Sequence, residues 1–149
     1  MEEKNYDALK LENQLCFPLY AASREVIKKY RPLLETLDLT YTQYITMMVF
    51  WVEQKINVKE LGRRLFLDSG TLTPVLKSLE AKGLVRRYRS AADERVLTVE
   101  ITEQGTALRE RALTVPAAIA ACIPLEPQKA IQLYGLLYEM LDALQKEDK

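Results

Sequence analysis

Apolar residues near the amino end recur every three or four positions, which is the spacing of one helical face. From about Ala8 to Tyr30 this pattern predicts a helix. Pro18 is expected to bend that helix, because proline has no N–H for the backbone hydrogen bond. The pair Arg31-Pro32 then predicts a break.

A second apolar run follows this break. Its helix is expected to run through Val52, and Thr40 or Thr42 can cap its first turn with a hydroxyl oxygen. Residues 53–57 are polar and are predicted to be a connection without regular structure.

The stretch 57–82 predicts two short helices joined by a turn. Asn57 can cap the first helix, and the side chain of Glu60 can reach back to the free N–H of the cap residue. The second helix is expected to begin at Asp68 or the next residue, and Gly83 can provide its left-handed stop. Apolar residues form one stripe of the second helix. The opposite face is small, polar or cationic and consists of Ser69, Gly70, Thr71, Thr73, Lys77 and Ser78.

After Gly83 the pattern changes to alternation, which predicts two strands, 84–89 and 97–101, with a polar tip between them. Two helices at a turn followed by a basic hairpin form a winged helix-turn-helix pattern. From Lys59 to Arg89 eight cations stand against three acidic residues, whereas the whole chain has a net charge of zero. A small α/β domain with a solvated charged face would share this charge. The order of cap, turn, small-faced helix and basic hairpin favours DNA binding.

The carboxyl-terminal third predicts helices again. Thr102 can cap a helix that continues through the alanine-rich residues 117–121, and Pro116 is expected to kink it. A last helix is predicted from about Gln128 to Lys146. Its apolar residues are too many for one stripe, which indicates burial on one side by its own subunit and on another by a second subunit.

Together these elements predict a single, mainly α-helical domain, 1–149, with a small β-hairpin. A winged helix-turn-helix at 40–101 is embedded in a helical dimerisation body made of 8–37 and 103–147. Two-fold symmetry would place paired winged helices in successive major grooves about 10 base pairs apart. The expected partners are therefore a second copy of the chain and double-stranded DNA with a palindromic operator.

Composition excludes several other classes of protein. The 149 residues contain no histidine, which removes the commonest general base and the commonest transition-metal ligand. The five glycines form no phosphate-binding loop, and two distant cysteines make a poor zinc site. No enzyme activity, cofactor or metal is expected. No signal peptide or membrane-spanning run is recognised, so a cytoplasmic location without a membrane partner is expected.

The segment LGRRLFLDSGTLTPVLKSLEAKGLVRR, followed by DERVLTVEITEQG, resembles the MarR family of dimeric winged-helix regulators. At the amino end, LENQLCFPLYAASREVIKKYRPLLETLDLTYTQY is similar to the organic-hydroperoxide-sensing branch of that family, in its two-cysteine form. This resemblance implies a repressor whose reduced dimer binds a palindromic operator and releases it after oxidation by an organic hydroperoxide.

The resemblance also implies roles for individual residues. Cys16 matches the sensing cysteine, and Cys122 has the position of the resolving cysteine. Tyr30 and Tyr41 match tyrosines whose hydroxyls, from the partner subunit, hydrogen-bond the sensing thiolate. Pro18 departs from the small residues usual at its position.

For DNA binding, the resemblance places Ser69, Gly70, Thr71 and Lys77 on the recognition helix. Arg95 matches a wing arginine that enters the minor groove, and Asp93 matches the residue that orients it. The complete set of residues expected at the DNA is Lys59, Arg63, Arg64, Ser69, Gly70, Thr71, Thr73, Lys77, Arg86, Asp93 and Arg95.

Each role has an ordinary alternative. Without the family, Cys16 between Leu15 and Phe17 would be a small core residue, and the two tyrosines would be interface residues. Cys122 could be a packed residue, with a small cellular thiol resolving oxidised Cys16. For the whole protein, the alternatives are a MarR-type repressor released by a small phenolic or other ligand and, least favoured, a thiol peroxidase.

Overall fold

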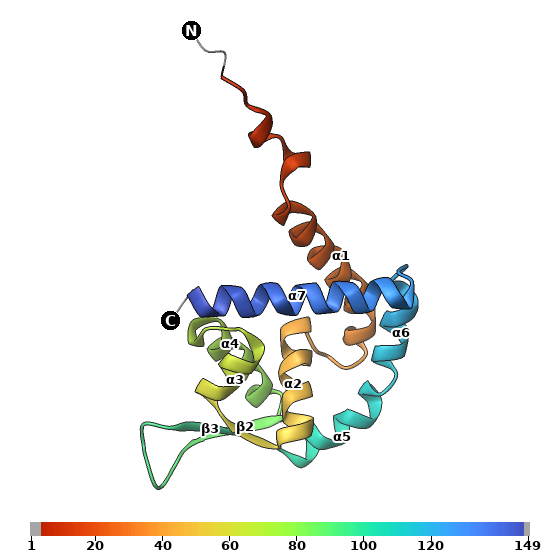
Figure 1. Ribbon diagram of the computed structural model, residues 1–149. Coiled ribbons are helices and arrows are strands. Elements are labelled where there is room, and N and C mark those ends of the chain that lie inside the picture. Colours follow the sequence, from red (N-terminus) through yellow and green to blue (C-terminus); the bar gives the residue numbers. More distant parts are fainter. Residues whose placement is uncertain (1–3, 148–149) are drawn as a thin grey trace. The chain divides into compact units, whose positions relative to one another are not determined.

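The computed structural model describes residues 4–147, which divide into two compact units, 4–119 and 120–147. Short 3-10 helices η1 (Asp7–Leu9) and η2 (Leu11–Asn13) precede the main elements, which Figure 1 shows. These are α1 (Cys16–Glu35), α2 (Tyr41–Glu53), β1 (Lys55–Asn57), α3 (Val58–Leu65), α4 (Ser69–Ala81), β2 (Val85–Arg89), β3 (Leu97–Ile101), α5 (Glu103–Ala112), α6 (Val115–Cys122) and α7 (Pro127–Glu147). The predicted fold class, mainly α with a small antiparallel sheet, is confirmed.

The amino-terminal helix differs from its prediction at both ends. It begins at Cys16 rather than at Ala8, so Pro18 lies in its first turn, where an N–H has no helical partner in any case. The predicted bend at Pro18 is therefore wrong. The predicted break at Pro32 is also wrong, since α1 continues to Glu35. Burial of Leu34 in the core offsets the one hydrogen bond that Pro32 removes.

Helix α2 begins with a complete capping box. The Thr40 hydroxyl accepts a hydrogen bond from the Gln43 N–H (3.3 Å), and Gln43 Oε1 accepts one from the Thr40 N–H (3.0 Å). Of the two predicted candidates, Thr40 and Thr42, it is therefore Thr40 that caps α2. The core of the first unit is built around α2, where Tyr44, Met47 and Phe50 are buried.

The two helices of the predicted turn are present as α3 and α4. Gly62 of α3 lies against the turn between them, since an added Cβ would be 2.8 Å from the Leu67 carbonyl oxygen. Helix α4 buries Leu72, Leu76 and Leu79 and is followed by Gly83 at φ 77°, the left-handed stop that was predicted.

The sheet has three strands in the order β1-β3-β2, all antiparallel. Its central strand, β3, places buried Val99 opposite both Ile56 and Arg87. The sequence predicted only β2 and β3 and took residues 53–57 for a connection. Strand β1 has only three residues, too few to show an alternating pattern.

Thr102 caps α5, as predicted, by accepting a hydrogen bond from the Gly105 N–H (3.1 Å). The single helix predicted from there to residue 121 is instead two helices, because α5 ends at Ala112 and α6 begins at Val115. Pro116 lies in the first turn of α6 and kinks nothing, since that position needs no N–H.

In the second unit, α7 agrees within one residue with the predicted last helix, 128–146. Large apolar side chains on it remain exposed: Ile131, Leu133, Tyr134, Leu136, Tyr138 and Leu144. Within residues 4–147, no helix is both long enough and apolar enough to cross a membrane.

Candidate nucleic-acid interface and cysteine site

The outer face of α4 carries small side chains, and the first turn of this helix is capped by a side chain. Asp68 Oδ1 accepts a hydrogen bond from the Thr71 N–H (2.7 Å), and this bond lowers the pKa of the Asp68 carboxyl below its usual value. Ser69, Gly70, Thr71 and Lys77 are exposed. A face of this kind is narrow enough to enter a major groove about 12 Å wide.

Two residues expected on that face are partly withdrawn from solvent. Thr73 is half-buried, and its hydroxyl donates to the Ser69 carbonyl (2.7 Å). Ser78 was placed on the outer face by its polarity, and this is wrong. It lies at the border of the buried stripe, where its hydroxyl accepts a hydrogen bond from Gln43 Nε2 of α2 (2.8 Å).

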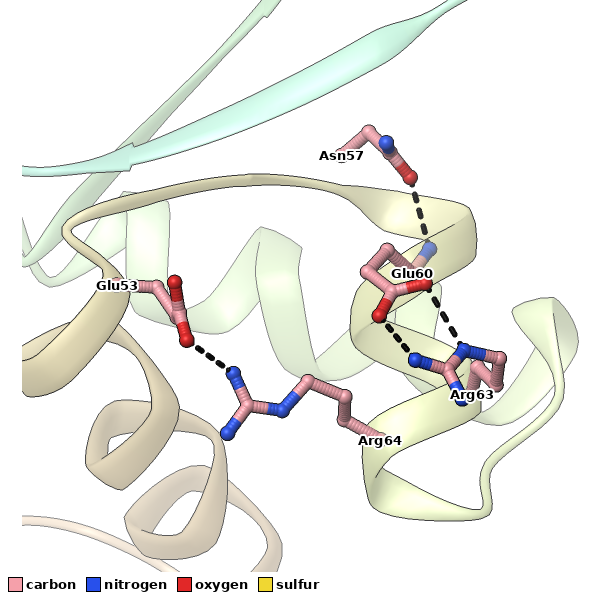
Figure 2. A network of polar contacts seen from close by, with 5 residues as sticks. All are labelled: Glu53, Asn57, Glu60, Arg63 and Arg64. Carbon is pink, nitrogen blue, oxygen red and sulfur yellow. Dashed lines mark hydrogen bonds and ion pairs between the residues drawn. The ribbon is translucent and has the colours of Figure 1, made fainter.

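The arginines of α3 are engaged with carboxylates (Figure 2). Both guanidinium contacts of Arg63 are to Glu60, and its Nε lies 2.9 Å from Glu60 Oε2. Arg64 donates to Glu53 of α2 at 2.6 Å. The pairing raises the pKa of Arg63 and lowers that of Glu60, through the hydrogen bond first and the charges second.

Asn57 caps α3 as predicted, accepting a hydrogen bond from the Glu60 N–H (2.8 Å; Figure 2). The Glu60 side chain was expected to complete a capping box by reaching back, and this is wrong. Its carboxylate binds Arg63 instead, because an arginine three positions later on the same helix provides a charge-assisted partner.

Strand β2 also pairs its cations internally. Arg86 stands opposite Glu100 in the sheet register and donates to it at 2.6 and 3.1 Å. Arg87 binds Glu80 of α4, and the backbone N–H and guanidinium of Arg87 lower the pKa of that carboxyl. The count of eight cations therefore overstates the charge that the free protein presents to DNA.

The hairpin tip holds one arginine in a fixed but solvent-facing position. Arg95 Nε lies 3.0 Å from Asp93 Oδ1, and a second guanidinium nitrogen lies 3.2 Å from Oδ2. The side chain of Arg95 is nevertheless 90% exposed. The Arg95 guanidinium also lowers the pKa of the Asp93 carboxyl. A bidentate ion pair thus orients a cation that projects from the wing.

Cys16 is the first residue of α1 and is exposed. Its neighbours Leu15 and Phe17 are exposed too, so the alternative that Cys16 is a core residue of its own chain is wrong. Backbone N–H groups at the start of a helix have no helical acceptor and carry partial positive charge.

Tyr30 and Tyr41 belong to an aromatic cluster in which their ring centroids are 4.9 Å apart. Tyr44 was not predicted to join this cluster, yet its centroid lies 5.9 Å from that of Tyr30 and 6.3 Å from that of Trp51. Burial raises the pKa of all three tyrosine hydroxyls. At neutral pH these hydroxyls are therefore protonated and can donate hydrogen bonds.

One chain cannot bring Cys16 and this cluster together. Tyr30 follows Cys16 by 14 positions in the same helix, so about 21 Å of helix axis separates their Cα atoms at 1.5 Å per residue. A tyrosine side chain spans only a fraction of that distance. Any hydrogen bond from Tyr30 to the Cys16 sulfur must therefore join two copies of the chain.

Cys122 is the last residue of α6, belongs to the second unit and is exposed. Its exposure argues against the simplest alternative, a residue packed within its own chain. Among the described residues, no group of three or more cysteine, aspartate or glutamate side chains is close enough to hold a metal ion.

A capped helix-turn-helix beside a three-stranded sheet, with an arginine at the hairpin tip, defines a winged-helix DNA-binding protein. Residues 28–111 match the family model "Transcriptional regulator SarA/Rot". The organic hydroperoxide resistance transcriptional regulator of Bacillus subtilis is 44% identical over 98% of this chain and 99% of its own length. The chain therefore belongs to the MarR family of winged-helix transcriptional regulators, and its relatives are regulators rather than enzymes.

Solved structures of AbfR, a protein of Staphylococcus epidermidis, have the same fold. Reduced AbfR bound to DNA superposes with a TM-score of 0.79 at 34% identity, covering 96% of this chain and 98% of that one. The disulfide form of AbfR gives a TM-score of 0.66 at 36% identity, covering 93% and 94%.

Proposed function

We propose that this regulator represses transcription while Cys16 is reduced and releases its operator when an organic hydroperoxide oxidises Cys16. The observation that carries the proposal is the placement of Cys16, exposed at the start of α1 and about 21 Å along that helix from the tyrosine cluster. Such a site is incomplete in one chain. The relationship to an organic hydroperoxide resistance regulator supports the same chemistry.

The proposed active form is a homodimer. In the amino-terminal segment Leu15 is 81% exposed, and in α7 Ile131 is 70% exposed. Exposed apolar side chains in such numbers indicate surfaces that another subunit covers. In the dimer, Tyr30 and Tyr41 of one subunit would donate hydrogen bonds to the Cys16 thiolate of the other, which favours the ionised, nucleophilic sulfur.

The proposed chemistry balances without a cofactor. The Cys16 thiolate attacks the terminal peroxide oxygen of ROOH, the O–O bond breaks, and the products are a cysteine sulfenic acid and the alkoxide RO⁻, which takes a proton from solvent to become the alcohol ROH. The thiol of Cys122 from the other subunit then displaces water from the sulfenic acid and forms a disulfide. The two Cα atoms must come within about 7 Å for that bond.

The alternative resolving agent is a small cellular thiol, which would displace water in the same way and form a mixed disulfide with Cys16. AbfR has been solved in a disulfide form, and this favours a protein disulfide here as well. A non-reducing gel after peroxide treatment separates the two cases. Cys122 as resolver gives a covalent dimer that is absent in Cys122→Ser, whereas a small thiol gives a monomer band in both proteins.

At the operator, we propose that α4 enters the major groove with Ser69, Gly70, Thr71 and Thr73, and that Lys77 lies further along the helix. Arg95, held by Asp93, would enter the minor groove from the wing. Lys59, Arg63, Arg64 and Arg86 would meet phosphates, which position a protein on DNA without reading its sequence. For the paired arginines, this requires exchange of a carboxylate for a phosphate.

The decisive test uses an operator selected with the reduced protein from a library of randomised inverted repeats. Operator affinity is then measured by fluorescence anisotropy with and without cumene hydroperoxide, for wild type, Cys16→Ser and Cys122→Ser. Release of wild type and retention by Cys16→Ser are expected. Equal release of wild type and Cys16→Ser would overturn the proposal, because oxidation would then act elsewhere.

One observation favours a second candidate, release by a small ligand. A cavity of about 330 Å³ in the first unit is lined by Leu37, Leu84 and Leu108 together with Lys82 and Arg111. Apolar walls with two cations suit a small carboxylate or phenolate, although Asp38 also lines the cavity and its carboxylate lies 3.7 Å from Lys82 Nζ. However, both cations already bind carbonyl oxygens, Lys82 that of Asp38 and Arg111 that of Thr36. Ligand-induced release that persists in Cys16→Ser would favour this candidate.

A further inference from the structure

Gln43 lies at a buried junction between α2 and the end of the recognition helix α4. Its side chain is 6% exposed. Its amide nitrogen donates to the hydroxyl of Ser78 (2.8 Å), and its amide oxygen accepts from Lys82 Nζ (3.0 Å) as well as from the Thr40 N–H. Ser78 belongs to the last turn of α4, and Lys82 is its C-cap residue. One side chain therefore joins the start of α2 to the end of α4.

The same junction reaches the turn between α1 and α2. Lys82 Nζ binds the carbonyl oxygen of Asp38, and the Asp38 carboxylate lies 3.7 Å away. Asp38 has a left-handed backbone, with φ 54°, at the end of that turn. The C-cap of α4 is thus attached to α2 through Gln43 and to the α1–α2 turn through Asp38.

The position of Gln43 within α2 gives this junction its significance. Tyr41 and Tyr44 flank it in the first turn of the helix, and both belong to the cluster that we propose to serve the partner's sulfur. A displacement of the tyrosines that shifts the first turn of α2 also moves Gln43, which lies between them in that turn. Since a buried amide without partners is costly, the hydrogen bonds to α4 are kept and the end of α4 follows.

We propose that Gln43 is the positioning residue that transmits a displacement at the tyrosine cluster to the recognition helix. It neither reacts with peroxide nor touches DNA. The inference rests on the proposed function, because it concerns how oxidation at Cys16 changes operator affinity. The hydrogen bonds of Gln43 connect α2 to α4, and the experiment below measures how strongly oxidation at Cys16 is coupled to operator affinity.

Two variants break the link in different ways. Gln43→Met keeps the length of the side chain and removes all three of its hydrogen bonds, whereas Ser78→Ala removes only the Gln43–Ser78 bond and leaves the Gln43–Lys82 bond and the capping box of α2 intact. Thr46→Val is the matched control. It also removes a buried hydroxyl hydrogen bond, from Thr46 to the Thr42 carbonyl (2.7 Å), but that bond stays within α2.

The measured quantity is the ratio of operator dissociation constants, oxidised over reduced, for each protein. Gln43→Met and Ser78→Ala are expected to lower this ratio by about three- to tenfold, because their oxidised forms keep more affinity. The reduced forms should bind within about threefold of wild type, and thiol titration should show the same rate of Cys16 oxidation. Thr46→Val should keep the wild-type ratio.

Emission from Trp51, the only tryptophan, provides a readout that a loss of stability alone would not reproduce. Trp51 lies on α2 and packs on Tyr44. Oxidation should change its emission equally in wild type and in Ser78→Ala, since α2 still responds while α4, coupled to Gln43 through Lys82 alone, follows less.

The outcomes separate the two proposals. If oxidation does not release wild type, the proposed function fails and this inference with it. If wild type is released and both linking variants keep its ratio, or if Thr46→Val lowers the ratio as much as they do, only the role of Gln43 is overturned. Ser78→Ala decides the matter should Gln43→Met not fold.

Discussion

The helix-turn-helix and the amino-terminal segment differ in the burial of their large apolar side chains. Between α3 and α4, Leu61, Leu72 and Leu79 are fully buried by contacts within one chain. In the segment from Leu9 to Tyr20, the large apolar side chains are exposed: Leu9, Leu11, Leu15, Phe17, Leu19 and Tyr20. The first region is complete in a single subunit, and the second is not.

This difference places the proposed DNA contact within the fold of a single chain and the proposed redox sensing in the dimer. Contact with DNA uses a module whose caps, core and wing are already formed in one chain. In the function that we propose, redox sensing uses Cys16, which lies in a segment whose surroundings form only when a second chain is present. Mutations in the two regions should therefore differ in whether their effects depend on protein concentration.

The largest effect on stability is expected from a substitution in the helix-turn-helix, which is complete in one subunit. Leu76→Ala removes a side chain that is 1% exposed in the core of α4. It should lower the free energy of unfolding by about 2–5 kcal/mol, from lost burial and the cavity that remains. Urea unfolding followed by circular dichroism measures this, and the loss should be the same at all protein concentrations. A concentration-dependent loss would place Leu76 in an interface.

A somewhat smaller effect is expected from α7, whose large apolar side chains are also exposed in one chain. Ile131→Ala should weaken the dimer by about 1.5–3 kcal/mol, the value of burying one such side chain, while leaving the fold of the winged helix unchanged. Sedimentation equilibrium gives the dimer dissociation constant for wild type and variant. An unchanged constant would show that the exposed face of α7 is not covered by a second copy.

The sequence predicted the winged helix well because its signals are local. Four helices are capped by the side chain of the residue before their first turn, namely Thr40, Asn57, Asp68 and Thr102. Gly83 follows α4 with a positive φ, a backbone conformation that favours glycine. A side chain that bonds a backbone group three positions away needs no tertiary contact. Such features are readable from a single sequence.

Where tertiary contacts decide, prediction from sequence was wrong. Pro32 was expected to end a helix that the burial of Leu34 instead continues, and strand β1 exists only because β3 is beside it. The basic patch was overcounted for the same reason. Glu100 pairs with Arg86 and Glu53 with Arg64, and neither acidic residue is close to its partner in sequence. The DNA and redox residues remain proposals that geometry supports.

On the wing, Arg95→Ala should weaken operator binding by about 1–3 kcal/mol and relax the preference for bases where the minor groove is narrow. Asp93→Asn, which keeps the shape and removes the charge that orients Arg95, should cost less. Anisotropy titrations on the operator and on a sequence with a changed minor-groove segment measure both effects. Equal losses on the two sequences would make Arg95 a phosphate contact only.

On α3, the effects are expected in operator affinity and its salt dependence. Glu60→Gln removes the carboxylate that engages Arg63, so the guanidinium becomes free to bind phosphate. Operator affinity should therefore rise, because no ion pair has to be broken first, and Lys59→Ala should reduce the slope of log affinity against log salt by about 0.9, the value for one lost phosphate contact. An affinity that Glu60→Gln leaves unchanged would mean that Arg63 faces away from the DNA.

The smallest effect is expected from the cap of α4. The Thr71 N–H lowers the pKa of Asp68 in the folded protein, so folding favours the ionised carboxyl. The resulting stability is complete above the unfolded pKa of about 4 and is lost as pH falls through the lower folded value. Asp68→Asn keeps an accepting oxygen but does not titrate. Thermal unfolding between pH 3 and 7 should therefore show wild type slightly more stable than the variant near neutrality, with a difference that shrinks as the pH falls below about 4. A difference that stays constant over this range would mean that the charge of Asp68 contributes nothing to the start of the recognition helix.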